Sequence, residues 1–527
     1  MLMILFVALA LQSAGALRLN KASPHLPILP TTRALKPQAN HPVITSSAAS
    51  SASVDKEGQQ SGLLPPWLPS FGTAALGGLL FGSDIGATSS VVRILGANTA
   101  DFGALNSAEL GQIASSSLIG AMAASAFLIF QGDKQIGRKL ELKVASILFI
   151  AGTLSQSLAP TLPLLLCGRV VYGLGIGFAM HVAPLFIAET APNDLRGKLV
   201  SYKEAAIVMG IVLGYAAGAL WGGDNGWRGV YESVLPLEAL MLAGAFAVPE
   251  SPRWLALRQR PEEAKEALMT IQGLSEERAS EQVKEMTTMT FSAGNKDGAA
   301  ESDTIIDKLN AIVSSPYNRQ ALVIGVGLVL FQQLSGQPSV LYFANRIFEK
   351  AGLGFEAALG VGVFKLIMTL VSANLVESPQ WGRRTLLLYG NAGITVSLVG
   401  LSLFYYLGGI SPDGPNQAGI IACILAFVGC YQIGFGPITW LVLSEIFPLQ
   451  IRSAAVSVGT LANFGSNLLI AGVFETEREA LGEPLLFAQF ALIALLATIF
   501  TNYYVFETRG LSLEEIEAKL KRIVDKE

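Results

Sequence analysis

The chain has 527 residues, of which 51% are hydrophobic and 14% are charged, and its formal net charge is −4. Soluble domains usually carry about 25% charged residues, so this composition excludes an ordinary soluble protein. The small net charge and the absence of basic blocks argue against nucleic-acid binding. Three cysteines inside apolar runs and three scattered histidines argue against a disulfide scaffold or a metal site. We therefore expect neither a metal nor another cofactor.

The first 69 residues have the composition of a targeting leader followed by a disordered segment. Residues 2–10 form an apolar run that is too short to span a membrane, and Ala14-Gly15-Ala16 resembles a signal-peptide cleavage site. Residues 17–54 contain basic, Ser, Thr and Pro residues but no acid, as transit peptides do. This two-part pattern predicts an internal membrane, such as a plastid envelope or the vacuole. A plain signal peptide or anchor with a disordered tail, and a plasma-membrane location, are the alternatives.

Apolar segments recur from residue 70 onward, and each is about long enough to cross a hydrocarbon core of ~30 Å as a helix. Six lie before a polar stretch at residues 249–319 and six lie after it. That stretch contains 9 Lys/Arg and 12 Asp/Glu and is predicted to be a solvated helical domain. The expected spans are 70–88, 109–131, 142–160, 163–186, 200–220, 229–248, 320–343, 357–376, 385–408, 417–443, 454–474 and 485–505.

The basic residues between spans predict the orientation. The loops after spans 2, 4, 8 and 10 contain ten Lys or Arg residues, whereas the opposite loops contain five. Because basic loops stay on the cytosolic side, we expect both termini and the middle domain on that side, or on the side facing the compartment of insertion in an organelle. Lys203 is counted here among the basic residues of the loop after span 4.

Three charged motifs recur in the same order in the two halves, which indicates duplication. Duplicated six-helix halves suit alternating access, with the substrate site at the midplane between them. The motifs are Gly137-Arg138-Lys139 and Gly382-Arg383-Arg384, Glu189-x-x-Pro192-x-x-x-Arg196 and Glu445-x-x-Pro448-x-x-x-Arg452, and Pro249-Glu250-Ser251-Pro252-Arg253 and Glu507-Thr508-Arg509.

From about residue 70 to 515 the chain resembles the sugar porters of the major facilitator superfamily. The resemblance rests on the duplicated motifs, on Gly173-Leu174-Gly175-Ile176-Gly177 and on Gln332-Gln333-Leu334-Ser335-Gly336. Residues 76–89, 175–192 and 336–344 are similar to the vacuolar and plastid subgroup, which is D-xylose-proton symporter-like. The resemblance implies an all-α membrane protein of twelve transmembrane helices in two pseudo-symmetric halves. The expected divisions are 1–69 (leader), 70–248 (first half), 249–319 (linker domain), 320–506 (second half) and 507–527 (tail).

Charges at the inner helix ends are candidates for a gate. Arginines and glutamates there can form forked pairs that hold the cytosolic side closed in one state; the alternative is that they are topology signals only. In two places the family's acid is displaced, to four residues before Gly137 and five before Gly382. The candidate gating residues are Asp133, Arg138, Lys139, Glu189, Arg196, Glu377, Arg383, Arg384, Glu445 and Arg452.

Charges inside the spans are expensive and usually functional. By resemblance, Asp84 in span 1 is a protonatable carboxylate and Arg169 in span 4 is its partner. A carboxylate beside an arginine stays ionised, and one that is separated and buried takes a proton. The alternative is a permanent ion pair in a uniporter. Lys365 in span 8 is a third charge, either at the sugar or paired elsewhere.

Amides and aromatic rings in the spans suit a sugar. Amides both donate to and accept from hydroxyl groups, and rings cover the apolar face; helix packing is the alternative for each residue. The resemblance implies a changed pocket, because Pro338 replaces an Asn, Glu204 a Gln, Ile211 another polar residue and Phe464 a Trp. The candidate substrate-binding residues are Phe81, Glu204, Gln332, Gln333, Gln337, Ser339, Tyr342, Lys365, Phe435, Trp440, Asn463, Phe464 and Asn467.

The sequence as a whole predicts transport of a hexose or pentose by alternating access, with proton symport. The expected partners are the sugar, the proton and membrane lipid, without nucleic acid, and the chain is expected to act as a monomer. A facilitative uniporter, a transporter of another polyol or organic solute and a non-transporting sugar sensor remain alternatives. An enzyme is disfavoured because no nucleophile–base constellation or phosphate loop occurs outside the membrane motifs.

Overall fold

The computed structural model describes residues 65–97, 101–130, 136–192, 195–221, 226–294, 315–337, 355–376, 378, 380–408, 414–448 and 451–524. Within these ranges the regular structure is entirely helical. Residues 1–64 of the expected leader and the candidate residues Asp133, Ser339, Tyr342 and Glu377 lie outside the described residues, and α2 begins at Leu68, within the range expected for the leader.

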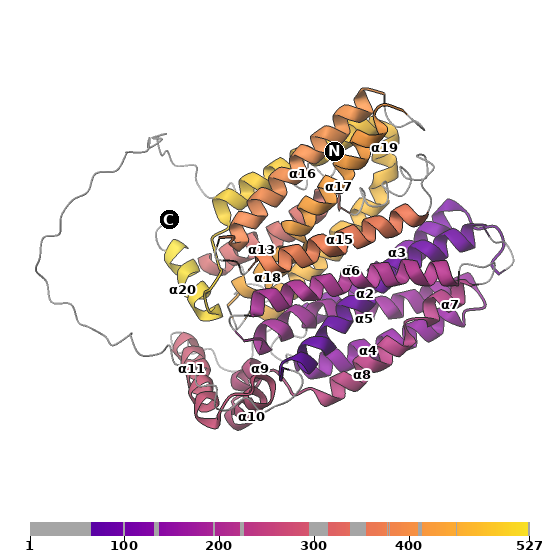
Figure 1. Ribbon diagram of the computed structural model, residues 1–527. Coiled ribbons are helices and arrows are strands. Elements are labelled where there is room, and N and C mark those ends of the chain that lie inside the picture. Colours follow the sequence, from indigo (N-terminus) through magenta and orange to yellow (C-terminus); the bar gives the residue numbers. More distant parts are fainter. Residues whose placement is uncertain are drawn as a thin grey trace, which may run out of the picture. The chain divides into compact units, whose positions relative to one another are not determined.

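The first half is a bundle of long helices (Figure 1). The sixth expected span is built from two helices, α7 and α8, because the chain turns at Ser233 and Pro236 starts a new helix. The helices of this half are α2 (Leu68–Ala97), α3 (Ser107–Phe130), α4 (Arg138–Ser157), α5 (Leu162–Thr190), α6 (Arg196–Leu220), α7 (Trp227–Glu232) and α8 (Leu235–Ala247).

The second half repeats this pattern with two interruptions. Gly434 separates α17 from α18 within one expected span. Gly482, with a φ of 72°, and the following Pro484 divide α19 into the last two spans. The helices are α13 (Pro316–Leu334), α15 (Phe355–Leu375), α16 (Arg383–Tyr406), α17 (Gln417–Ile433), α18 (Phe435–Ile446), α19 (Arg452–Tyr504) and the C-terminal α20 (Leu513–Val524).

Each of the twelve expected spans overlaps a helix or a helix pair of the described chain, and residues 338–343 of the seventh span lie outside it. Eight helical segments there are long and apolar enough to cross a membrane, and two shorter ones, Leu359–Leu375 and Ala454–Ile470, are apolar as well. The remaining two expected spans correspond to α4 and α13, which contain more polar residues. The prediction of an all-helical membrane protein with two six-helix halves is confirmed.

The distribution of side chains indicates lipid around the bundle. Large apolar side chains lie on its outside, including Leu220, Val396 and Tyr406, which are 76%, 72% and 78% exposed. Arginines and carboxylates lie inside, including Arg169 and Glu238, which are both 0% exposed. This pattern suits a hydrocarbon surrounding with a polar interior, because intramembrane charges normally face the bundle interior.

Helices α2 and α6 approach closely through glycines spaced four residues apart. A Cβ on Gly82 would lie 1.8 Å from the carbonyl oxygen of Ile207, and one on Gly210 would lie 2.0 Å from that of Leu79. Small residues at this spacing let two helix backbones touch within a membrane. The contact holds α6, which carries Glu204, against α2, which carries Asp84.

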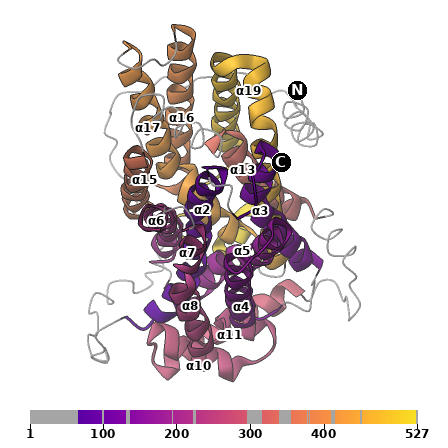
Figure 2. The ribbon, with the colours of Figure 1, turned by 90° about the vertical axis from the view of Figure 1, so that its right-hand side faces the viewer.

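The two halves meet through two symmetry-related helix pairs. Helix α6, the fifth span, packs against α15, the eighth, and α3, the second span, packs against α19, whose first part is the eleventh (Figure 2). Exchanging the halves converts one pair into the other, as a pseudo-two-fold axis requires. Helix α18 also contacts α5 and α6. The interface therefore contains spans that carry candidate site residues.

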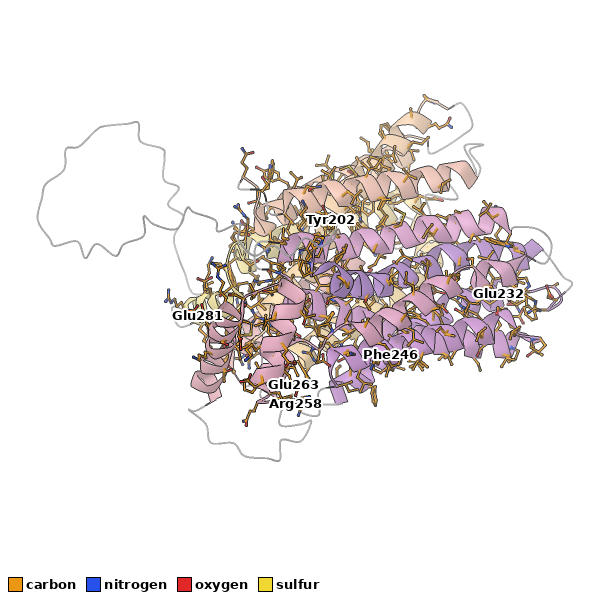
Figure 3. The ribbon with its side chains drawn as sticks, turned by 60° about the horizontal axis from the view of Figure 1, so that its bottom comes forward. Tyr202, Glu232, Phe246, Arg258, Glu263 and Glu281 are labelled. Carbon is orange, nitrogen blue, oxygen red and sulfur yellow. The ribbon has the colours of Figure 1, made fainter. Side chains whose placement is uncertain are left out.

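The polar linker forms three helices at one end of the bundle: α9 (Pro252–Leu257), α10 (Pro261–Gln272) and α11 (Glu276–Gly294). They share a small core that includes Leu268 and Ile271. The Gln272 amide donates to the carbonyl of Thr190 at the end of α5 over 3.1 Å. Figure 3 shows Arg258, Glu263 and Glu281 of this linker at one end, and Glu232 of α7 at the other.

Candidate functional site

Asp84 and Arg169 form a buried ion pair inside the first half. Nη1 of Arg169 lies 3.0 Å from Oδ1 of Asp84, and Nη2 lies 3.4 Å from Oδ2, so the pair is forked. The residues are 6% and 0% exposed. The structure thus brings together the two residues that the sequence predicts as a coupling pair. Such a forked pair adds directional hydrogen bonds to the attraction between the charges.

Every N–H of the Arg169 guanidinium has an acceptor. Besides Asp84, it donates to the Tyr231 hydroxyl and the Ser117 hydroxyl, each over 3.0 Å, and to the carbonyl of Ile113. Ser117 in turn donates to Asp84 over 2.9 Å, and Thr88 donates to it over 3.4 Å. A carboxylate that accepts from an arginine and two hydroxyls is stabilised in its ionised form.

Gln332 and Gln333 present open hydrogen-bond acceptors from α13. The Gln332 amide donates to the carbonyl of Phe435 over 2.8 Å, and the Gln333 amide donates to the side-chain oxygen of Asn463. The residues are 2% and 6% exposed, yet among the described residues no donor reaches the Oε1 atom of either. An unpaired buried carbonyl is costly, so both atoms are suited to accept from hydroxyl groups of a ligand.

Helix α13 ends beside these glutamines. Gly336 adopts a φ of 86°, and a Cβ there would lie 2.7 Å from the ring of Phe490. Only glycine meets both conditions without strain. Gln337 follows and is partly buried. The regular helix α13 therefore ends at Leu334, directly after the two glutamines.

Aromatic rings from both halves lie near the glutamines. The rings of Phe81 in α2 and Phe464 in α19 meet edge to face, with centroids 5.9 Å apart. Trp440 and Phe435 in α18 are 4% and 0% exposed. Asn467 lies in α19 and is partly exposed. The α2–α19 ring contact joins the two halves directly.

Three charged side chains lie in this region, those of Lys203, Glu204 and Lys365. From the sequence, Lys203 was expected to lie in a loop. Lys203 is part of α6 and is 0% exposed, so it belongs to the interior and not to a loop. Its Nζ lies 3.6 Å from Oε2 of Glu204 and 4.9 Å from the ring centroid of Trp440. Lys365 in α15 is 7% exposed and interacts electrostatically with Glu204. Lys203 lies seven residues past Arg196 and inside the expected span 200–220. This position could have shown that its side chain is buried.

At the inner end, each half contains one buried arginine–glutamate pair. Arg138 in α4 and Glu189 in α5 are 3.0 Å apart, and Arg383 in α16 and Glu445 in α18 are 3.1 Å apart. Each glutamate also accepts from a hydroxyl of the segment after the sixth span of its half: Ser251 to Glu189 over 2.6 Å, and Thr508 to Glu445 over 3.1 Å. The duplicated motifs therefore build duplicated contacts.

A second acid in each half caps a helix. Glu250 accepts from the backbone N–H of Lys139, and Glu507 accepts from those of Arg383 and Arg384. Acids at helix N-termini are stabilised by these free N–H groups, but burial raises the pKa of Glu250 above its ordinary value. The side chain of Arg384 donates to the side-chain oxygen of Asn502 over 2.9 Å and not to a gate glutamate.

One inner ion pair crosses between the halves. Nη1 of Arg196 in α6 lies 4.0 Å from Oε1 of Glu445 in α18. Arg452 interacts electrostatically with Glu189, and its Nε donates to the carbonyl of Phe447. The inner end is therefore joined across the halves in this conformation.

Two buried acids in the first half were missed in the sequence. Nδ1 of His181 in α5 lies 2.7 Å from Oε2 of Glu141 in α4, and the side chains are 0% and 1% exposed. The Thr153 hydroxyl donates to Glu238 in α8 over 2.6 Å. The available signal was an acid or a histidine inside an otherwise apolar helix.

Comparison with known proteins agrees with this architecture. The sequence pattern of the family described as "Sugar (and other) transporter" matches residues 72–520. The chain is 42% identical over 475 residues to an Arabidopsis thaliana protein named "D-xylose-proton symporter-like 3, chloroplastic". The alignment covers 85% of this chain and 81% of that protein. The name of this relative describes a transport protein.

Two solved structures of XylE, a proton:xylose symporter, share the fold. The structure bound to 6-bromo-6-deoxy-D-glucose has a TM-score of 0.75 at 28% identity and covers 86% of this chain and 98% of that one. The inward-open structure of XylE from E. coli has a TM-score of 0.61 at 28% identity, and the alignment covers 85% of this chain and 98% of that one. The lower score of the inward-open form agrees with the joined inner end. The chain is thus a multi-pass membrane protein that belongs to the sugar (and other) transporter family, the sugar porters of the major facilitator superfamily.

Proposed function

We propose that this protein carries a monosaccharide across a membrane by alternating access. The observation that carries the proposal is the pair of buried acceptors on Gln332 and Gln333, which have no donor among the described residues and lie beside the aromatic side chains of both halves. Hydroxyl groups of a sugar satisfy such acceptors, and rings such as Trp440 cover its apolar face. Relatives that are named as xylose and glucose transporters support a pentose or hexose.

The moving units are the two six-helix segments, residues 70–248 and 320–506. Residues 249–319 form a linker on the inner side, and residues 507–527 form a tail. A single chain contains both halves and is therefore the working unit. In the described conformation the Arg196–Glu445 contact joins the inner ends. Sugar reaches the site from the opposite side, and inward opening separates this contact.

Transport is coupled to protons through Asp84. Paired with Arg169, Asp84 is stabilised as the anion. When the pair separates in the outward state, the buried carboxylate takes a proton, and sugar binding follows. Renewed pairing in the inward state releases the proton, so a pH gradient drives accumulation. A uniporter in which the pair is a permanent strut is the competing possibility.

The membrane is an internal one, such as a plastid envelope or the vacuole, and the plasma membrane is the alternative. The composition of residues 1–54 motivates this proposal. A relative that is named as chloroplastic supports it.

Uptake into proteoliposomes tests the proposal. Purified full-length protein is reconstituted, and exchange of radiolabelled xylose, glucose and a polyol is measured with and without a pH gradient. Saturable exchange of a monosaccharide, accumulated when the outside is acidic, is expected. Exchange of the polyol alone would contradict the sugar assignment. Sugar exchange without a response to the gradient would favour the uniporter.

A further inference from the structure

Lys203, Glu204 and Lys365 form a buried charged cluster at the interface of the halves. Lys203 and Glu204 belong to α6 and Lys365 belongs to α15, and these two helices pack against each other. Lys203 lies seven residues from the inner end of α6, which is about 10 Å into the bundle. The Nζ of Lys203 lies 4.9 Å from the ring centroid of Trp440, which belongs to the candidate sugar site. The cluster is therefore part of the proposed site.

The charges in this cluster do not balance. Among the described residues, Glu204 is the acid that acts electrostatically on both Lys203 and Lys365. Two buried lysine side chains thus share one carboxylate. The Nζ of Lys203 and the Oε2 of Glu204 each lack a hydrogen-bond partner in the described part of the chain, and Lys203 is 0% exposed. Asp84 and Arg169 neutralise each other and supply no further negative charge.

An uncompensated buried charge is costly, and it is normally retained where a ligand or partner offsets it. A neutral sugar would leave one positive charge enclosed when both sides of the transporter are shut. A substrate with one negative charge would remove it. The loose geometry of Lys203, 3.6 Å from Glu204 and without a full hydrogen bond, leaves its N–H groups available to such a substrate.

We propose that this site accepts a monosaccharide carrying a carboxylate, a hexuronate, with Lys203 and Lys365 as the cationic groups that bind it. The inference rests on the proposed function as a monosaccharide transporter and narrows its substrate class. Charge-assisted hydrogen bonds from ammonium groups to a carboxylate are strong in a water-poor site. The unpartnered oxygens of Gln332 and Gln333 remain for the hydroxyl groups.

The number of charges selects a carboxylate over a phosphate. With both lysines protonated, the cluster has one positive charge in excess, whereas a phosphate monoester carries about −1.5 to −2 at neutral pH. A hexuronate carries one negative charge and balances the cluster. Co-transport of this anion with the proton on Asp84 would then move no net charge across the membrane.

The test uses D-xylose, D-glucose and D-glucuronate, which share ring stereochemistry and differ in the group on C5. Exchange of each labelled compound and its competition against the others are measured in proteoliposomes containing the full-length protein. D-glucuronate is expected to exchange and to compete about tenfold better than D-glucose. A sugar phosphate, glucose 6-phosphate, is expected to compete poorly.

Variants assign the effect to the cluster. Lys365→Gln is expected to weaken competition by glucuronate at least about tenfold more than it weakens competition by xylose. Glu204→Gln removes the internal anion and is expected to strengthen glucuronate competition. Lys143→Gln is the matched control, because its Nζ also lies over a ring, that of Phe246 at 4.3 Å, outside the site. If Lys365→Gln does not fold, the wild-type competition series and Glu204→Gln still decide.

The outcomes separate this inference from the proposed function. Exchange of xylose and glucose without any exchange or competition by glucuronate overturns the inference and leaves sugar transport intact. An equal loss for all three compounds in Lys365→Gln also overturns it, because the lysine would then act on the fold or the sugar ring. Failure of all three to exchange in the wild type overturns the proposed function itself.

Discussion

Glu445 is held more tightly by its own half than by the other half. Its Oε1 lies 3.1 Å from Arg383 in the same half but 4.0 Å from Arg196 across the interface. Both contacts are buried. The cross-half contact is thus the weaker of the two, so inward opening can separate the halves while each half keeps its internal pair.

Arg196→Gln should therefore open the inner end without unfolding either half. Breaking a buried pair by removing one partner costs on the order of 3–5 kcal/mol, and even a part of this changes the ratio of closed to open forms by about tenfold or more. Spin labels at the exposed positions Glu266 and Arg522, in a chain without its native cysteines, report the distance between the inner ends. The control is Arg260→Gln, whose pair with Glu263 is exposed. An unchanged distance distribution would count against a gating role.

Asp84→Asn mimics the protonated acid and should keep sugar exchange while abolishing uphill uptake. The amide cannot release a proton when Arg169 returns, so a pH gradient no longer does work on the sugar. Glu238→Gln is the control, since it is a buried acid of the same half bonded to Thr153 and not to an arginine. Sugar-evoked acidification of sealed vesicles is the measurement. Wild-type sugar movement without acidification would defeat the coupling proposal.

Gln332→Ala should abolish uptake at substrate concentrations near the wild-type KM while the protein still folds, with a melting temperature lowered by the loss of the amide that donates to the carbonyl of Phe435. The mutation removes an acceptor that has no donor among the described residues, so transport loses more than the fold does. Asn463→Ala should behave similarly. Asn391→Ala is the comparison, because this buried amide donates to Thr501 within the second half. Normal uptake by both site variants would remove these residues from the site.

Gly82→Ala should greatly reduce the thermal stability and the yield of folded protein in detergent. Its new Cβ would lie 1.8 Å from the backbone of Ile207, so α2 and α6 would have to separate. Gly72→Ala in the same helix meets no atom within 4 Å and should be neutral or slightly stabilising. Fluorescence-detected melting curves compare the two. Equal stability of the two variants would contradict the close approach of the helices.

A fluorescent fusion at the C-terminus should mark an internal membrane. Residues 1–54 have a signal-like segment followed by a basic, acid-free segment, which together direct the chain away from the cell surface. Deleting residues 17–54 should redistribute the fusion. A uniform ring at the cell surface with the intact chain would refute the internal location.

The apolar segments predicted the fold because membrane-spanning helices satisfy a local rule. Each needs enough consecutive apolar residues, so the spans containing Asp84 and Lys365 could be located without knowledge of their neighbours. The same rule was insufficient for Lys203. Its nearness to Arg196 made it look like a loop charge, whereas the helix already begins at Arg196 and turns Lys203 inward onto Trp440.

Pairings between distant residues could be proposed from the sequence only by resemblance. Arg138 and Glu189 are 51 positions apart, and their contact depends on the antiparallel packing of α4 and α5. The His181–Glu141 pair arises from the same packing and had no recognisable motif. Motif recurrence revealed that the halves are equivalent, but not which atoms meet.

The sequence by itself determined the number, order and apolar character of the membrane helices, the duplication of the halves and the family. The membrane helices follow from composition and apolar length along the chain, whereas the duplication and the family rest on the recurring motifs and on the resemblance that these carry. Only the tertiary structure decided that Glu204 is shared between lysines of two helices, that Arg196 reaches Glu445 across the halves, and that Gln332 and Gln333 retain unbound acceptors. Charge balance and hydrogen-bond satisfaction are properties of groups brought together in space, so they arise only when α6 packs against α15 and α18.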